Sequence, residues 1–282
     1  MQARKRTGVM QAKPFEERLL RRMSPIVIVQ PKLDGARIRA VWNGSSYVLF
    51  SSTGLVVNSI PTIQKSLNSI AEDINYITLD GEAYRPDMKL QQIMRIVSKT
   101  TSVDQYQWML SYHIFDIINA RDQLNRVLQL FSIKKIFGNT ESLELVPHFP
   151  AKQDNWQEYL QKFMEMHYEG IIIRDANALY TCGKQSCILK VKPTKLDEYR
   201  ILGCTQAISI GGEPKGMVGA FNLIDSTGNH FQASAGRLNH DERAMWWNKK
   251  DELPGKICVV KYLTLTERGV PREPVTMEIK EA

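Results

Sequence analysis

The 282-residue sequence lacks several features that would place it in a specialised class of protein. No apolar run is long enough for a transmembrane helix, and the basic N-terminus has no hydrophobic segment of a secretory signal. The four cysteines have no paired Cys-x-x-Cys spacing, so we expect reduced thiols of a cytoplasmic protein and no zinc site. No internal repeat or low-complexity tract is present. Hydrophobic content of 43% and charged content of 24% are those of an ordinary globular protein with one large or two unequal domains.

Acidic residues are scarce near the N-terminus. The formal net charge is +7, and residues 1–31 contain seven basic side chains but only two acidic ones. A basic balance suits a polyanionic partner such as nucleic acid. The alternative, for residues 1–12, is a solvated basic tail.

Hydrophobic periodicity predicts alternating helices and strands up to about residue 192. Asn43-Gly44 lies between two alternating runs and predicts a hairpin turn. The predicted helices cover residues 13–23, 61–72, 90–97, 124–131 and 155–168. The predicted strands cover residues 26–29, 37–42, 47–50, 76–79, 108–118, 143–146 and 188–191.

After Pro193 short strands separated by glycines dominate, with one short helix at 241–247. Five short strands and one helix in so few residues predict a small β-barrel of the OB type. The expected fold class is therefore α+β, with domains at 1–195 and 196–282. The predicted barrel strands cover residues 199–204, 219–224, 230–233, 256–262 and 276–280.

Residues 30–37, Gln-Pro-Lys-Leu-Asp-Gly-Ala-Arg, lie between two predicted strands. They hold Lys32 at a strand end, with Asp34 two residues on and Arg37 five residues on. Gly35 permits a tight backbone path and close approach of a ligand. Alone, this short pattern favours a surface hairpin with a salt bridge.

Further charged residues fall at the ends of other predicted strands, where side chains can converge on one pocket. These are Glu82, Glu169 and the pair Lys190 and Lys192, which share one face of a strand. Two adjacent amines invite a phosphate between them, whereas a solvated sheet face is the bland alternative. Phe115 offers a flat ring for stacking on a base, with a buried core position as its alternative.

These residues make chemical sense together. A lysine attacks phosphorus only as the neutral amine, and an unperturbed pKa of about 10.4 leaves little of that form at neutral pH. Nearby cations, here Lys190, Lys192 and a metal ion, disfavour the charged form of Lys32. Glu82 and Glu169 are hard oxygen donors that suit Mg²⁺.

In this order, the motifs KLDG, LDGEAY, YHIFDII, EGIIIR and LKVKP resemble the nucleotidyltransferase motifs of ATP-dependent DNA ligases. RNA ligases and mRNA capping enzymes share them more loosely. The resemblance runs from about residue 26 to the C-terminus. The chain is similar in its organisation to the compact DNA ligases of viruses and phages and to small bacterial DNA ligases. It implies an adenylation domain of antiparallel sheets with flanking helices, followed by an OB-fold barrel. The KLDGAR arginine and residues 216–220, GMVGA, resemble the DNA ligase branch.

The resemblance to this family also implies its three-step reaction. Lys32 would attack the α-phosphorus of ATP to give lysyl-AMP, with Mg²⁺ or Mn²⁺ as the metal. AMP would pass to the 5′-phosphate of a nick in double-stranded DNA, and the 3′-hydroxyl would then displace it. The resemblance implies a cytoplasmic monomer that does not bind membranes.

The resemblance assigns roles to the residues around the lysine. Lys32 and Asp34 would be catalytic, and Phe115 would stack on adenine. Gln30, two residues before the lysine, would read the adenine edge. Arg37 would bind the ribose or the nick phosphate.

The phosphate and metal roles fall on later motifs. Glu169 would be the principal metal ligand, and Glu82 would contact the ribose and help to bind the metal. The triphosphate would be held by Lys184, Lys190 and Lys192. Lys184 replaces an arginine often found in the family.

Near the C-terminus, Arg272 and Lys280 would orient the leaving pyrophosphate. Lys280 stands where an arginine is usual, and Ser52 stands where the family often has an arginine after the first hairpin. Only 31 residues precede the nucleophile, so the basic N-terminal segment is expected to substitute partly for a large DNA-binding domain. The expected DNA-binding residues are Arg4, Lys5, Arg6, Arg37 and Ser52.

Two other functions are compatible with these patterns. One is an RNA ligase or another nucleotidyltransferase acting on RNA ends. The other is a non-catalytic OB-type nucleic-acid-binding protein with a decayed nucleotide pocket. Use of NAD⁺ is not expected, because that branch has an additional N-terminal domain.

Overall fold

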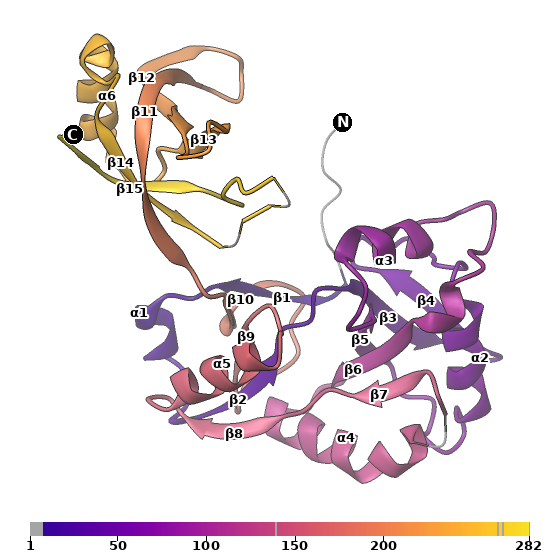
Figure 1. Ribbon diagram of the computed structural model, residues 1–282. Helices are drawn as coiled ribbons and strands as arrows, with labels where there is room; N and C mark the ends of the chain where they lie inside the picture. Colours follow the sequence, from indigo (N-terminus) through magenta and orange to yellow (C-terminus); the bar gives the residue numbers. More distant parts are fainter. Residues whose placement is uncertain (1–7, 139, 264, 267, 282) are drawn as a thin grey trace. The chain divides into compact units, whose positions relative to one another are not determined.

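The computed structural model describes residues 8–138, 140–263, 265–266 and 268–281. The chain divides into two compact units, 1–191 and 192–282 (Figure 1). The predicted boundary between residues 195 and 196 falls one residue inside the first strand of the second unit. In the described parts of the chain, no helix has both the length and the apolar character needed to cross a membrane.

The first unit contains two five-stranded sheets (Figure 1). In spatial order, the first sheet consists of β1 (Met10–Pro14), β10 (Gly183–Val191), β9 (Ile171–Asp175), β2 (Ile26–Pro31) and β8 (Phe149–Lys152). The second sheet consists of β4 (Tyr47–Ser51), β3 (Ala36–Trp42), β5 (Leu79–Tyr84), β6 (Ser111–Ile117) and β7 (Leu143–Leu145). The pairs β1·β10 and β6·β7 are parallel, so the sheets are mixed rather than purely antiparallel.

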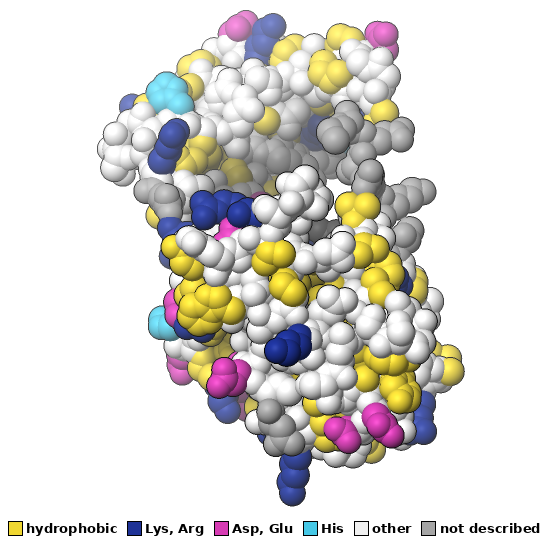
Figure 2. All heavy atoms as spheres, turned by 90° about the vertical axis from the view of Figure 1, so that its right-hand side faces the viewer, with side chains coloured by type: hydrophobic (Ala, Val, Ile, Leu, Met, Phe, Trp, Pro, Cys, Tyr) yellow, Lys and Arg dark blue, Asp and Glu magenta, His cyan; other side chains and the backbone are white. Residues whose placement is uncertain are grey.

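Helices cover the outer faces of these sheets. Their bounds are α1 (Glu17–Leu20), α2 (Pro61–Ser69), α3 (Leu90–Val97), α4 (Gln123–Phe137) and α5 (Trp156–Glu165), with a 3-10 turn η1 (Gln107–Met109). Ile63 of α2 and Ile93 of α3 are fully buried against the second sheet. Phe163 of α5 is buried against the first sheet. Figure 2 shows that several groups of apolar side chains remain at the surface on the side of α2 and β4, as is usual for a globular domain.

Alternation along β3 separates this core from the candidate site. Ile38 and Ala40 are fully buried in the core that α2 and α3 cover. Arg37 and Arg39 therefore project from the opposite face. The predicted hairpin is present, because the Asn43 side-chain oxygen accepts two backbone N–H bonds and Gly44 has a φ of +101°.

The second unit is a closed barrel with the strand order β11-β12-β13-β15-β14. Its strands are β11 (Lys195–Ile208), β12 (Pro214–Ile224), β13 (His230–Ser234), β14 (Ile257–Tyr262) and β15 (Val275–Lys280), with α6 (His240–Asn248) and the 3-10 turn η2 (Lys250–Glu252) between β13 and β14. Ile201, Phe221, Leu223 and Val260 are fully buried inside it. The prediction of an OB-type barrel is confirmed.

The first unit differs from the predicted pattern at several places, three of which have a clear physical reason. Residues 13–23 do not form one helix, because residues 10–14 pair with β10 and only the short α1 follows. β5 begins at Leu79 rather than at residue 76, since Asn75 and Tyr76 have positive φ angles. β8 was not predicted. In each case a long-range pairing or a turn overrides local periodicity.

Close backbone packing under β5 gives a test of the fold. A Cβ added to Gly81 would lie 2.6 Å from the His113 carbonyl oxygen, too close for an ordinary contact. We expect Gly81→Ala to lower the free energy of unfolding by roughly 2 kcal/mol, measured by urea denaturation. Gly138→Ala is the control, because its Cβ would meet only the Lys135 carbonyl oxygen at 3.6 Å. Equal stabilities of the two variants would contradict the packing argument.

Candidate active site

Lys32 and Glu169, 137 residues apart in the chain, meet at the ends of β2 and β9. The Lys32 N–H donates to the Gly170 carbonyl at 2.9 Å, and the Glu169 N–H donates to the Lys32 carbonyl at 3.3 Å. The Lys32 ammonium forms an ion pair with the Glu169 carboxylate, and each side chain remains 20% exposed. The predicted nucleophile and the predicted metal ligand therefore lie side by side, at a position that a substrate can reach.

Glu82 lies in the same cluster, on β5. It is opposite Arg37 of β3 and opposite His113 of β6. Burial raises the pKa of Glu82 to about 7; the charges of Arg37 and Lys32 oppose this rise, and Asp80 and Asp34 add to it. Near neutral pH the carboxyl group can therefore either donate a hydrogen bond to a hydroxyl or bind a cation as the carboxylate.

Arg37 is held by a buried carboxylate. Its Nε and Nη2 atoms donate to Asp80 at 2.9 and 2.5 Å, and Asp80 is fully buried. Burial opposes the charge of Arg37, but Asp80, with smaller contributions from Tyr180 and Glu82, raises the pKa of Arg37 overall. The Nη1 atom has no hydrogen-bond partner among the described residues. Arg37 thus keeps one free edge for a ligand.

Two arginine groups of the site lie near the Phe115 ring. The Arg37 Cζ atom is 5.0 Å from the ring centroid, and the Arg174 Cζ atom is 5.4 Å from it. The Phe115 carbonyl accepts the Gln30 Nε2 atom at 2.9 Å and the His148 Nε2 atom at 3.0 Å. Burial lowers the pKa of His148 to about 4, so this imidazole is neutral and donates from Nε2.

Gln30 does not have the exposed side chain that hydrogen bonding to the adenine base would require. Its side chain is only 1% exposed, and its oxygen accepts the Arg174 Nε atom at 2.7 Å. Gln30 therefore supports the backbone of Phe115, a role that the sequence did not suggest. Its contact with adenine stays a prediction.

A buried charged network lies beneath these residues and was missed from the sequence. Asp116 accepts Arg126 Nε at 2.7 Å and Arg174 Nη1 at 2.9 Å, and all three side chains are buried. Tyr180 donates to Asp80 at 2.5 Å. Three of these residues, Asp80, Asp116 and Arg174, lie inside the sequence motifs quoted above, where a charged residue next to an apolar run could have indicated a buried charge. Nothing in the sequence around Arg126 or Tyr180 indicated that they belong to the network.

The remaining predicted residues of the first unit lie around this cluster or outside it. Lys190 of β10 is partly buried and lies opposite Ile172 of β9. Lys184, on the same strand, is exposed. Asp34 is partly buried between β2 and β3, and Ser52 is partly buried in the turn after β4. Arg4, Lys5 and Arg6 lie outside the described residues.

Three predicted residues belong to the second unit. Lys192 is its first residue and directly follows β10. Arg272 is exposed. The Lys280 ammonium pairs with Glu198 at 2.9 Å on the barrel surface, and this hydrogen bond raises the pKa of Lys280.

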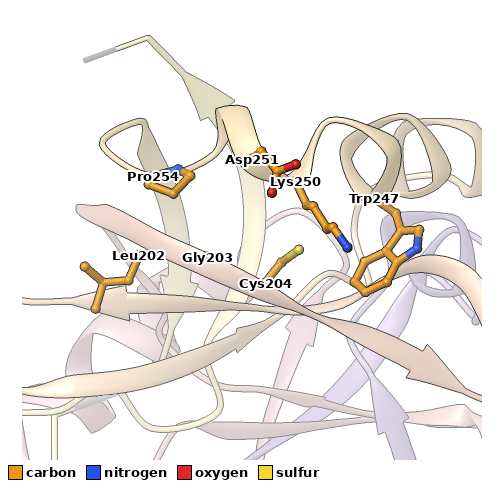
Figure 3. Close-up of a pocket in the computed structure, with 7 residues that line it drawn as sticks. All are labelled: Leu202, Gly203, Cys204, Trp247, Lys250, Asp251 and Pro254. Atoms are coloured by element: carbon orange, nitrogen blue, oxygen red, sulfur yellow. The ribbon is translucent and has the colours of Figure 1, made fainter.

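A separate pocket of about 400 Å³ lies in the second unit (Figure 3). Its lining residues are Leu202, Gly203, Cys204, Trp247, Lys250, Asp251 and Pro254. The Lys250 ammonium lies 4.9 Å from the centroid of the Trp247 ring and therefore already covers one face of that ring. None of the predicted site residues lines this pocket. The lysine and carboxylates needed for nucleotidyl transfer lie in the first unit.

A strand-end lysine with two carboxylates, followed by an OB-type barrel, defines the class of nucleotidyltransferases. Comparison with known proteins gives the family. The model of the "ATP dependent DNA ligase domain" matches residues 9–192, and that of the "DNA ligase OB-like domain" matches residues 211–280. The chain belongs to the ATP-dependent DNA ligases, as its sequence motifs predicted.

Individual relatives agree with this assignment. A DNA ligase of Haemophilus influenzae is 23% identical over 246 residues, which cover 87% of this chain and 83% of the relative. A DNA ligase of African swine fever virus is 27% identical over 277 residues, covering 90% of this chain but only 63% of the viral protein.

Solved structures show the same fold. A structure described as one of Lig E DNA ligases has a TM-score of 0.73 at 20% identity, covering 97% of this chain and 99% of the other. The ligase of bacteriophage T7 in complex with ATP has a TM-score of 0.55 at 16% identity, covering 95% and 97% of the two chains.

The raised pKa of Glu82 predicts a pH-dependent stability. Because the folded pKa of about 7 exceeds the usual value of 4.5, the neutral carboxyl stabilises the fold. This contribution is complete below pH 4.5 and is lost as the pH rises through 7. Relative to Glu82→Gln, we expect the wild type to lose on the order of 2 kcal/mol of unfolding free energy over that range.

Urea unfolding of both proteins at several pH values measures this difference. Glu72→Gln is the control, since Glu72 is exposed and its substitution should leave the pH profile unchanged. Parallel profiles for the wild type and Glu82→Gln would show that the carboxyl titrates normally.

Proposed function

We propose that this ligase seals nicks between a 5′-phosphate and a 3′-hydroxyl in duplex DNA, with Lys32 as the nucleophile that carries AMP. The ion pair of Lys32 with Glu169, held by reciprocal backbone hydrogen bonds at the ends of β2 and β9, is the observation that carries the proposal. The lysine amine is partly exposed to solvent, and a metal ion held by the neighbouring carboxylates would favour its neutral, nucleophilic form.

The metal that the family implies fits the donors present. Glu169 and Glu82 would hold Mg²⁺ or Mn²⁺, because both offer carboxylate oxygens. The described residues contain no group of three or more metal-ligating side chains. Magnesium sites are commonly built from one or two carboxylates and completed by water and substrate phosphates. When bound, such an ion would neutralise phosphate charge, and Glu169 would then serve as its ligand instead of pairing with Lys32.

The chemical steps balance without another co-reactant. The neutral Lys32 amine attacks the α-phosphorus of ATP; the N–P bond forms, the bond to pyrophosphate breaks, and the nitrogen releases one proton to solvent. The 5′-phosphate of the nick then attacks the same phosphorus, and the N–P bond breaks as the nitrogen takes up a proton and leaves as the free amine. In the last step, the 3′-hydroxyl attacks the 5′-phosphate, loses its proton and displaces AMP.

The surrounding residues bind and orient the substrates in this proposal. Phe115 stacks on adenine, over the backbone that Gln30 supports. The free edge of Arg37 binds the ribose or the nick phosphate, and Asp34 assists Lys32. The triphosphate is held by Lys184, Lys190 and Lys192, and the leaving pyrophosphate is oriented by Arg272 and Lys280. Lys280 must exchange its surface partner Glu198 for that task.

Two further parts of the proposal concern the whole protein. We place it in the cytoplasm as a monomer, in agreement with its four free cysteines. The N-terminal segment, with Ser52 as a minor contact, binds DNA phosphates. In support, the Gly8 carbonyl accepts Arg39 Nη1 at 2.9 Å. Gly8, the first described residue, therefore lies beside the strand face that carries Arg37.

Covalent labelling tests the nucleophile. Lys32→Ala should abolish transfer of radiolabelled AMP from ATP to the protein, because no other group replaces the amine. Lys134→Ala, an exposed lysine of α4, should label normally. Labelled enzyme should then seal nicked DNA in preference to nicked RNA, with GTP and NAD⁺ as nucleotide controls. Labelling of Lys32→Ala at the wild-type level would remove the proposal, and DNA binding without any labelling by the wild type would favour a non-catalytic role.

Salt dependence tests the N-terminal contact. Replacing Arg4, Lys5 and Arg6 with glutamine should weaken binding of a nicked duplex and reduce the slope of log K against log salt by up to about 3. A variant with the same loss of charge on or near α4, at Arg121, Lys134 and Lys135, controls for net charge. An unchanged slope in the N-terminal variant would exclude phosphate contacts by this segment.

A further inference from the structure

We propose that Tyr180, which lies between β9 and β10, is a positioning residue that fixes Arg37 in place for the ligation reaction. The inference rests on the proposed function and adds a residue to it. It follows from one continuous chain of contacts that runs from the N-terminal strand β1 through Tyr180 and Asp80 to Arg37.

The hydrogen-bond direction along this chain is set by chemistry. The Met10 N–H of β1 lies 3.1 Å from the Tyr180 hydroxyl oxygen, and a backbone N–H can only donate. The Tyr180 oxygen is therefore the acceptor there, and its own hydrogen points to Asp80 Oδ2 at 2.5 Å. Burial, with the Asp80 charge adding to it, raises the pKa of Tyr180, so the hydroxyl keeps its proton.

Asp80 transmits this constraint to Arg37. Its two oxygens accept Arg37 Nε and Nη2, and the Tyr180 hydroxyl is the remaining hydrogen-bond donor that contacts this buried carboxylate among the described residues. Tyr180 donates to Oδ2, the oxygen that Arg37 Nη2 also contacts, so a second residue binds the carboxylate in addition to Arg37. This additional donor fixes the direction of the carboxylate, and the guanidinium that it binds is fixed with it.

The ring of Tyr180 is held independently of its hydroxyl. The Arg126 Cζ atom lies 5.6 Å from the ring centroid, and Arg126 is bound to Asp116 in the second buried ion pair. The Tyr180 side chain thus contacts both charged groups beneath Phe115. Removing the hydroxyl alone should leave the ring in place while freeing Asp80.

The consequence concerns the free edge of Arg37. Its Cζ atom lies over the Phe115 ring, where the proposed function places the nucleotide. If Asp80 turns, the free Nη1 atom changes direction relative to that ring. Steps that need Arg37 should therefore slow in the absence of the hydroxyl, although Tyr180 itself does not contact substrate.

The experiment uses Tyr180→Phe and measures three rates separately. These are AMP transfer from ATP to the protein, AMP transfer from labelled protein to nicked DNA, and sealing of a pre-adenylylated nick. We expect Tyr180→Phe to slow the same steps as Arg37→Lys, by roughly tenfold, the value of one hydrogen bond to a charged group. The double variant should match Arg37→Lys within about twofold, since the hydroxyl acts only through Arg37.

Tyr47→Phe is the matched control. The Tyr47 hydroxyl is also buried in the first unit, but it donates to the Ile77 carbonyl at 2.8 Å and does not contact Asp80. It should lose stability without any preference among the three steps. Thermal unfolding of every variant separates lost folding from lost positioning.

Three results would overturn the inference. They are wild-type rates for Tyr180→Phe, wild-type rates for Arg37→Lys, and a double variant in which the two losses multiply. Failure of the proposed function itself is seen earlier, as absence of covalent AMP on the wild-type protein.

Discussion

The site depends on the cost of burying charge. Two carboxylates, Asp80 and Asp116, lie fully buried on neighbouring strands of the second sheet. A buried carboxylate is tolerated only when its oxygens are bound, and removing one partner of such a pair typically costs several kcal/mol. Arg37, Arg126 and Arg174 supply those partners from β3, α4 and β9. The positions of these three elements are therefore tied to one another directly beneath Phe115.

The reactive pair above this base has the opposite character. Lys32 and Glu169 keep a fifth of their side-chain surface in contact with solvent, so their ion pair is less costly to open. In the proposed reaction, Lys32 leaves Glu169 and attacks phosphorus. A fixed buried network with a replaceable pair at its edge allows that exchange without disturbing the fold.

What the sequence could predict follows from where each interaction resides. Lys32, Glu82 and Glu169 come at the ends of apolar runs inside recognisable motifs, so their convergence was predictable. The partner of Gln30 is the carbonyl of Phe115, and a backbone atom leaves no trace in residue identity. The pairing of β1 with β10 joins segments about 170 residues apart, beyond the reach of local periodicity. Helical spacing around Leu19 and Leu20 therefore suggested a longer helix than α1.

The unexpected strand β1 also brings residues 10–14 next to the candidate active site, because it pairs with β10. In the first sheet, β10 lies between β1 and β9, so the strand that carries Lys184 and Lys190 is paired on both sides. Without β1, β10 would be an edge strand with exposed backbone groups. Strand β1 also supplies the Met10 N–H that donates to the Tyr180 hydroxyl. Strand β1 thus completes the sheet that carries Lys184 and Lys190, the proposed phosphate ligands, and it is linked through Tyr180 and Asp80 to Arg37.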